Sequence, residues 1–236
     1  MEYGEERGGM TGTELKLLAM ASMALDHGAY VLLYPLTAGD EALYGFYLAL
    51  RAAGRLAFPI YAFLLVQGFL HTSGKGRYLA RLCAFALISE IPFDLAIAGE
   101  LVYPGAQNVF VTLAAGMGTL WAMERWGRDR LFPSALIALA GGLAAELLRA
   151  DYGLQGVLLP AVIYLFRRDP AARMTGELAV LATLLRGPRD IPCLLAVPIT
   201  ERYNGRRGPR LGLWAYWFYP LHLLAFLGLR MAAAAL

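Results

Sequence analysis

The sequence has little charge and few reactive side chains. Charged residues make up 17% of the 236 residues and hydrophobic residues 58%, whereas soluble domains average roughly 25% and about 45–50%. The two cysteines are isolated, which excludes zinc ribbons and CxxC redox motifs. The three histidines are dispersed, so we expect no metal site. The glycine-rich phosphate motifs GxGxxG and GxxxxGK[ST] are absent, and no nucleic-acid partner is expected.

What the sequence has instead is a series of apolar stretches. Its mean hydropathy is +0.51, and a membrane-spanning helix needs about 20 predominantly apolar residues. We predict an all-α, polytopic transmembrane helical bundle with about 7–8 membrane segments. The chain forms a single integral-membrane domain, 1–236, in which residues 1–13 are a flexible cytoplasmic N-terminus. The predicted helices lie at about 14–36, 46–70, 77–98, 108–124, 131–148, 153–167 and 212–234.

Basic residues gather in alternate connections between the predicted helices. Lysine and arginine in short loops stay on the cytoplasmic side of a membrane, so the pattern predicts a cytoplasmic N-terminus. The intervening connections hold only Arg149. In contrast, 13 of the 21 basic residues fall in the loops 71–81, 124–131, 167–175 and 201–211.

The region near 175–200 does not fit this alternation. Its interior, from Arg186 to Pro192, is polar and broken, and each apolar flank is only about ten residues long, half a span. A single crossing would place loop 201–211 outside with its four arginines, whereas a re-entrant hairpin would keep that loop inside. Broken backbone is tolerated in a membrane when it is buried in protein or lines a watery cavity. The sequence favours the hairpin slightly and leaves both topologies open.

A few ionisable residues fall inside the predicted helices, where a charge costs at least about 2.5–3.5 kcal/mol. Asp26 and His27 lie near the middle of the first helix. Lys16 precedes His27 by eleven positions, so the two share a helix face about 16 Å apart along the axis. In the second helix, Arg55 needs an acidic partner, for which Asp26 is the candidate, while Arg51 is expected to reach the outer interface. A snorkelling lysine, a packed histidine and a structural ion pair are the alternatives.

Other polar residues recur at the helix ends and in the third helix. Glu90 and Asp94 share one face, where two acids repel each other unless a cation intervenes; a helix-packing role is the alternative. Asn108 has the position of an ordinary helix N-cap, and Asp151 lies in a short turn. His222, in the stretch Tyr219-Pro220-Leu221-His222, brings a second imidazole into the membrane.

These segments together resemble the TraX family, and they run in order from about residue 14 to 224. The family is named for the conjugation protein that N-acetylates F-type pilin. It is similar to integral-membrane acyltransferases that modify cell-surface sugars, whose first helix has a basic residue, ten intervening positions and a histidine. Lys16 and His27 match that spacing. The stretches that carry the resemblance are Leu25-Asp26-His27, Gly54-Arg55-Leu56-Ala57-Phe58-Pro59, Gln67-Gly68-Phe69, Ser89-Glu90-Ile91-Pro92-Phe93-Asp94, Gln107-Asn108-Val109-Phe110, Asp151-Tyr152-Gly153, Tyr203-Asn204-Gly205 and Tyr219-Pro220-Leu221-His222.

The resemblance implies an acyltransferase of the bacterial cytoplasmic (inner) membrane that uses acetyl-CoA, with His27 as the central catalytic residue. The acceptor would be an amine or hydroxyl of a protein, glycan or lipid. The catalytic candidates are His27, Asp26, Arg55, Glu90 and Asp94. The candidates for binding the phosphates of acetyl-CoA are Lys16, Lys75, Arg77 and Arg81. The candidates for binding the acceptor are Gln107, Asn108, Asp151, Tyr152, Tyr203, Asn204 and His222.

Two other functions remain open at this point. A proton-coupled transporter would also need buried acids, histidines and a broken helix, although no inverted repeat is visible in the sequence. A membrane scaffold for another protein is a third possibility, but it has no evident use for buried charges. Binding of acetyl-CoA in detergent would separate the first function from the other two.

Overall fold

The computed structural model describes residues 8–235, and these residues form helices joined by short connections. Within that range the only β-type pairings are two isolated bridges, Met10 with Tyr203 and Gln107 with Ala150. The predicted all-α fold is therefore confirmed for the described part of the chain.

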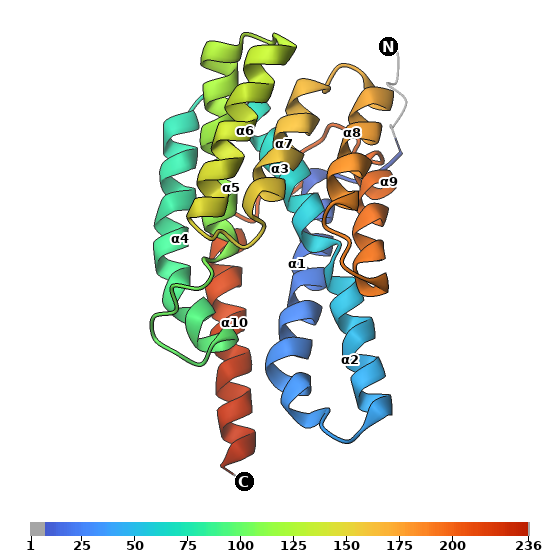
Figure 1. Ribbon diagram of the computed structural model, residues 1–236, viewed down its shortest axis with the longest axis vertical. Helices are drawn as coiled ribbons and strands as arrows, with labels where there is room; N and C mark the ends of the chain where they lie inside the picture. Colours follow the sequence, from blue (N-terminus) through green and yellow to red (C-terminus); the bar gives the residue numbers. More distant parts are fainter. Residues whose placement is uncertain (1–7, 236) are drawn as a thin grey trace.

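The N-terminal part forms a long hairpin (Figure 1). Helix α1 (Gly12–Gly28) begins with a capping box between Thr11 and Glu14 and continues through a π-helical turn and a 3-10 turn to Leu36. Helices α2 (Glu41–Gly54) and α3 (Ala57–His71) return along it. The break between α2 and α3 falls at Arg55. Pro59 explains its position, because a proline ring displaces the carbonyl four residues earlier.

The middle of the chain packs against α3 as a group of neighbouring helices. Asn108 caps the start of α5 by accepting from the Phe110 backbone N–H. Helix α3 is central, with Ile60, Val66 and Phe69 fully buried. The members of this group are α4 (Lys75–Ile97), α5 (Val109–Ala122), α6 (Leu131–Leu147) and α7 (Gly153–Leu165), and α10 (Trp214–Ala234) lies against α4.

The segment that contains the broken sequence turns back on itself. Helix α8 (Pro170–Ala182) is followed by a 3-10 helix (Pro188–Leu195) and the short α9 (Ala196–Thr200), which lies beside α8 in Figure 1. The next loop then hydrogen-bonds to the start of α1: the Met10 N–H donates to the Arg202 carbonyl at 2.7 Å. The backbone of this region therefore folds back as a hairpin, as the sequence slightly favours, while the way this segment lies in a membrane stays a prediction.

The N-terminus divides into two parts. Residues 1–7 lie outside the described residues. In contrast, residues 10–13, which were expected to be flexible, are held in place. The backbone N–H groups of Gly12 and Thr13 donate to the carbonyls of Arg206 and Arg207, each at 2.9 Å. The beginning of α1 and the loop 201–213 therefore form one structural unit.

The outer surface is that of a membrane protein. Three helical stretches in the described residues, Gly12–Leu36, Glu41–His71 and Trp214–Ala234, are long and apolar enough to cross a membrane, and Leu131–Leu147 and Gly153–Leu165 are shorter apolar helices. Large apolar side chains are widely exposed, among them Leu87 at 79% and Leu147 at 85%. A soluble monomer rarely exposes so much apolar surface. The number of seven or eight membrane segments stays a prediction.

Candidate functional site

A small cavity of about 30 Å³ lies beside the C-terminal end of α1. It is lined by Asp26 and His27 from α1, by Tyr61 from α3, and by Asp151 and Tyr152 from the connection before α7. This volume holds only one or two water-sized groups. The sequence candidates from the first helix and from the Asp151-Tyr152-Gly153 turn are therefore brought together, although 125 positions separate Asp26 from Asp151.

His27 makes its closest polar contact with His222, a histidine of the last helix. Its Nδ1 lies 2.7 Å from Nε2 of His222 in α10. The His222 side chain is buried, and the edge of its ring meets Tyr219, which also contacts His27. The structure thus places His222 directly behind His27. The sequence suggested His222 as an acceptor-binding residue, but it does not line the small cavity.

Asp26 is held by a different arginine from the one expected. Its Oδ2 forms an ion pair with Arg51 at 2.9 Å, while its Oδ1 is buried without a hydrogen-bond partner among the described residues. Gly54 makes this approach possible, because a Cβ there would lie 2.3 Å from the Cβ of Asp26. The prediction that Arg51 reaches the outer interface is wrong, because the Asp26 carboxylate offers it an internal partner.

Arg55 is paired with a residue that the sequence analysis did not include. Its Nε lies 3.3 Å from Oδ1 of Asp190, whose side chain is only 8% exposed. The predicted pairing with Asp26 is therefore wrong. The reason is the hairpin, which brings its polar turn against the α2–α3 break. The sequence signal that could have identified Asp190 as the partner of Arg55 is an aspartate inside a broken apolar segment.

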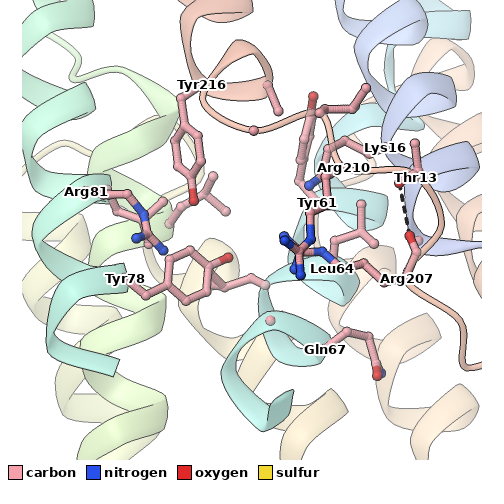
Figure 2. Close-up of a pocket in the computed structure, with 18 of the residues that line it drawn as sticks. Thr13, Lys16, Tyr61, Leu64, Gln67, Tyr78, Arg81, Arg207, Arg210 and Tyr216 are labelled. Carbon is pink, nitrogen blue, oxygen red and sulfur yellow. Dashed lines mark hydrogen bonds between the residues drawn. The ribbon is translucent and has the colours of Figure 1, made fainter. Parts of the chain in front are cut away.

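A second, larger cavity of about 630 Å³ adjoins the first. The two share four lining residues, including Tyr61 and Tyr219. Figure 2 shows Arg81 with Tyr78 and Tyr216 on one side of this cavity and Lys16 with Arg210 on the other. Its basic side chains are Lys16, Arg81, Arg207 and Arg210, together with His71.

The electrostatic character of the larger cavity is one-sided. Within residues 8–235 no aspartate or glutamate lines it, and Lys16, Arg81, Arg207 and Arg210 take part in no ion pair. Cations around one cavity attract an anionic ligand and repel each other without one. Lys16 and Arg81 were predicted to bind phosphates. For Arg207 and Arg210 the sequence predicts only a place in a basic loop that sets the orientation in the membrane.

Two other predicted phosphate-binding residues lie elsewhere. Lys75 forms an ion pair with Glu124, which belongs to the turn after α5. Arg77 is exposed, and neither residue lines a cavity. Both are at the first turn of α4, whereas Arg81, one turn further on, lines the larger cavity. Of the three predicted phosphate-binding residues in the loop 71–81, only Arg81 thus lines the larger cavity.

Glu90 and Asp94 lie outside both cavities. Glu90 accepts hydrogen bonds from the side chain and backbone of Asn108. Asp94 accepts from the Tyr103 backbone N–H at 2.8 Å. The two acids therefore fix the connection between α4 and α5, and the structure does not bring them to His27.

The remaining predicted acceptor residues have two kinds of position. Tyr203 lines the larger cavity and meets Phe63 edge to face. Gln107 and Asn108 belong to the connection before α5, where the Gln107 N–H donates to the Arg149 carbonyl at 2.9 Å. Asn204 shapes its own turn, accepting from the Arg206 N–H at 2.9 Å. Of these four residues, only Tyr203 lines a cavity.

Asp151 has a distinctive electrostatic setting. It lies in the connection between α6 and α7, and its side chain faces the small cavity. Removal from bulk water by the surrounding protein, together with the nearby Asp26 carboxylate, raises the pKa of Asp151 to about 6, although Arg55 and Arg51 oppose the shift. A carboxyl group with a raised pKa that lines the same cavity as an imidazole is suited to binding or exchanging protons.

The fold and the cavities define a helical membrane protein with an internal histidine pair next to a cationic cavity. Comparison with known proteins gives its family: the family model described as TraX protein matches residues 11–230. The chain belongs to the TraX family. It is similar to the probable fimbrial assembly protein FimC, serogroup H1, of Dichelobacter nodosus, with 28% identity over 242 residues, 92% of this chain and 95% of the relative. No solved structure matches the chain.

Proposed function

We propose that the protein is a membrane acyltransferase that moves an acetyl group from cytoplasmic acetyl-CoA to an amine or hydroxyl of an envelope component. The observation that carries the proposal is the cationic cavity of about 630 Å³ next to the His27 cavity. The family membership supports it, because the resemblance implies this donor and this histidine. The protein would lie in the inner membrane with its N-terminus in the cytoplasm.

The larger cavity suits the donor in size and charge. Its volume falls within the roughly 300–1,000 Å³ typical of small-molecule sites. Lys16, Arg81, Arg207 and Arg210 would bind the phosphates, and Tyr61 and Tyr219 would border the path of the thioester to the small cavity. Cations in a partly enclosed site bind phosphate more strongly than cations in bulk water. Arg207 and Arg210 belong to loop 201–211, which is one of the basic connections of the chain. Basic connections are expected on the cytoplasmic side of a membrane, where the donor is found.

The smaller cavity suits the chemistry. His27 would take the proton of the acceptor as the acceptor nitrogen or oxygen attacks the thioester carbon. The carbon–sulfur bond then breaks, and the departing thiolate takes up a proton. Acyl transfer through the imidazole itself is the covalent form of the same reaction. The volume of about 30 Å³ favours a short acyl group.

The charges around the small cavity favour an amine as the acceptor. Asp26 and Asp151 both line it, and carboxylates attract an ammonium group before it loses its proton to a base. The name of the Dichelobacter nodosus relative refers to fimbrial assembly. A protein amine is therefore the first acceptor to test, with an envelope glycan or lipid as the others.

The test measures both donor binding and product. The purified protein in detergent is titrated with acetyl-CoA, and envelope proteins, glycans and lipids of cells with and without it are compared by mass spectrometry. We expect saturable binding and an acetyl mass increment that His27→Ala abolishes while the variant still folds. A general base contributes roughly 10²–10⁴-fold in rate.

Matched arginine variants test the donor site. Arg210→Ala, which changes the cavity wall, should weaken acetyl-CoA binding at least tenfold, whereas Arg77→Ala, on the exposed side of α4, should leave it unchanged. Full activity of His27→Ala would refute the mechanism. A folded protein that binds no acetyl-CoA would refute the function and favour the transporter.

A further inference from the structure

The contact between the two histidines has a defined geometry. His27 Nδ1 and His222 Nε2 are 2.7 Å apart. The ring planes differ by only 4°, and the ring centroids are 5.0 Å apart. Because each nitrogen lies on the perimeter of its ring, these values describe two imidazoles meeting edge to edge through a hydrogen bond. One of the two nitrogens must carry the proton.

The hydrogen bond on the other side of His222 determines which of the two nitrogens carries the bridging proton. Its Nδ1 lies 2.6 Å from the backbone carbonyl oxygen of Phe218. A carbonyl oxygen only accepts, so Nδ1 of His222 carries a proton. A neutral imidazole has a single N–H, so Nε2 of His222 is the acceptor. The bridging proton then belongs to Nδ1 of His27, and Nε2 of His27 has the free lone pair.

The surroundings of His222 hold this arrangement in place. The Phe218 ring stacks against it with centroids 4.8 Å apart, and the Phe226 ring meets it edge-on at 5.7 Å. Gly28, next to His27, leaves room for that ring, because a Cβ there would lie 3.2 Å from Phe226. The rings that contact His222 are thus aromatic and uncharged. Charged side chains lie toward His27 instead: Asp26 and Asp151 line the small cavity with it, and Arg51 pairs with Asp26.

We infer that His222 is a positioning residue that fixes His27 as the Nδ1–H tautomer and presents its unprotonated Nε2 to the small cavity. The inference deepens the proposed function and rests on it for its catalytic consequence. During acyl transfer, Nε2 of His27 takes the acceptor proton while Nδ1–H donates to His222. The positive charge formed on His27 is stabilised by that hydrogen bond, and Nε2 returns the proton to the departing thiolate.

The tautomer itself is measurable without turnover. The chain has three histidines, so the 15N NMR spectrum of histidine-labelled protein in detergent contains few imidazole signals, and His27→Asn and His71→Asn assign them. We expect His27 to show a protonated Nδ1 and an unprotonated Nε2 at pH 8. A His27 that is protonated at Nε2 in the wild-type protein would overturn the inference.

Two substitutions of His222 separate positioning from packing. His222→Gln keeps an acceptor in the side-chain amide oxygen, whereas His222→Leu fills the space without one. We expect His222→Leu to lower kcat about 100-fold with little change in the KM for acetyl-CoA, and His222→Gln to recover at least tenfold of that loss. Equal kcat in the two variants, with both folded, would overturn the inference.

The two measurements also distinguish the two proposals. If no acyl transfer is found but the tautomer is as expected, the proposed function fails and the assignment of the histidine pair stands. If acetyl transfer occurs and the tautomer is the opposite one, the function stands and the role of His222 fails. The NMR result does not depend on the His222 variants, so a misfolded His222→Leu leaves the inference testable.

Discussion

Gly54→Ala tests whether the close approach of α1 and α2 determines the geometry of the site. An added Cβ at Gly54 would lie 2.3 Å from the Cβ and 2.7 Å from the Cγ of Asp26. These atoms are at the base of the side chain, so a rotamer change does not relieve the clash and the two helices must separate. Overpacking of this kind typically costs about 1–3 kcal/mol.

The same helix offers a matched control. Gly45 is exposed in α2, and a Cβ there would have no atom within 4 Å. Gly45→Ala gains about 0.5–1 kcal/mol of helix propensity in the helix interior, and Gly54→Ala, at the last residue of α2, gains less. A difference larger than about 1 kcal/mol therefore reports the clash. Thermal unfolding in detergent should place Gly54→Ala below Gly45→Ala, by about 2–4 °C for each kcal/mol. Equal midpoints would show that α1 and α2 are not in the contact described.

Three other perturbations test separate parts of the site. Asp190→Asn leaves Arg55 without its acidic partner. Loss of one partner from a buried pair costs about 3–5 kcal/mol, and the partial exposure of Arg55 reduces the expected cost to about 1–3 kcal/mol. Unchanged thermal stability of this variant would count against the pair. Lys16→Ala should raise the KM for acetyl-CoA with kcat nearly unchanged, and an unaltered KM in steady-state kinetics would remove Lys16 from the donor site. In the unfolded chain the Asp151 carboxyl group has its ordinary pKa of 3.8, whereas in the folded chain its pKa is raised to about 6. The stability of the folded protein should therefore fall as pH rises between these values. Asp151→Asn should flatten that part of a plot of melting temperature against pH, and a curve identical to wild type would contradict the shift.

The helices were predictable because their signals are local. Length and hydropathy place the helices predicted at 77–98, 131–148 and 212–234 close to α4, α6 and α10. The helix predicted at 46–70 is instead divided at Arg55 into α2 and α3. Asn108 caps a helix as its sequence context indicates. The spacing of Lys16 and His27 predicts that both share one face of α1, and in the structure each of them lines one of the two adjoining cavities. These features depend on residues a few turns apart on one helix.

The pairings were not predictable, because they depend on which helices become neighbours. Arg51 and Arg55 are one turn apart and chemically alike, and only the fold decides that the first meets Asp26 and the second Asp190. Likewise, loop 201–213 supplies Arg207 and Arg210 to the cavity because its backbone is bound to the start of α1. A single sequence contains no signal for either contact beyond the presence of charges.

The contacts between the two ends of the chain set an order of events during synthesis. Thr13 bonds to the carbonyls of Arg207 and Pro209, 194 and 196 positions later, and His27 bonds to His222 across 195 positions. The cationic cavity and the histidine pair therefore cannot form while the chain is still emerging from the ribosome. A nascent or truncated chain inserts its first helices with neither the cavity wall nor the partner of His27. The proposed chemistry would thus become possible only after the last helix has been released into the bilayer.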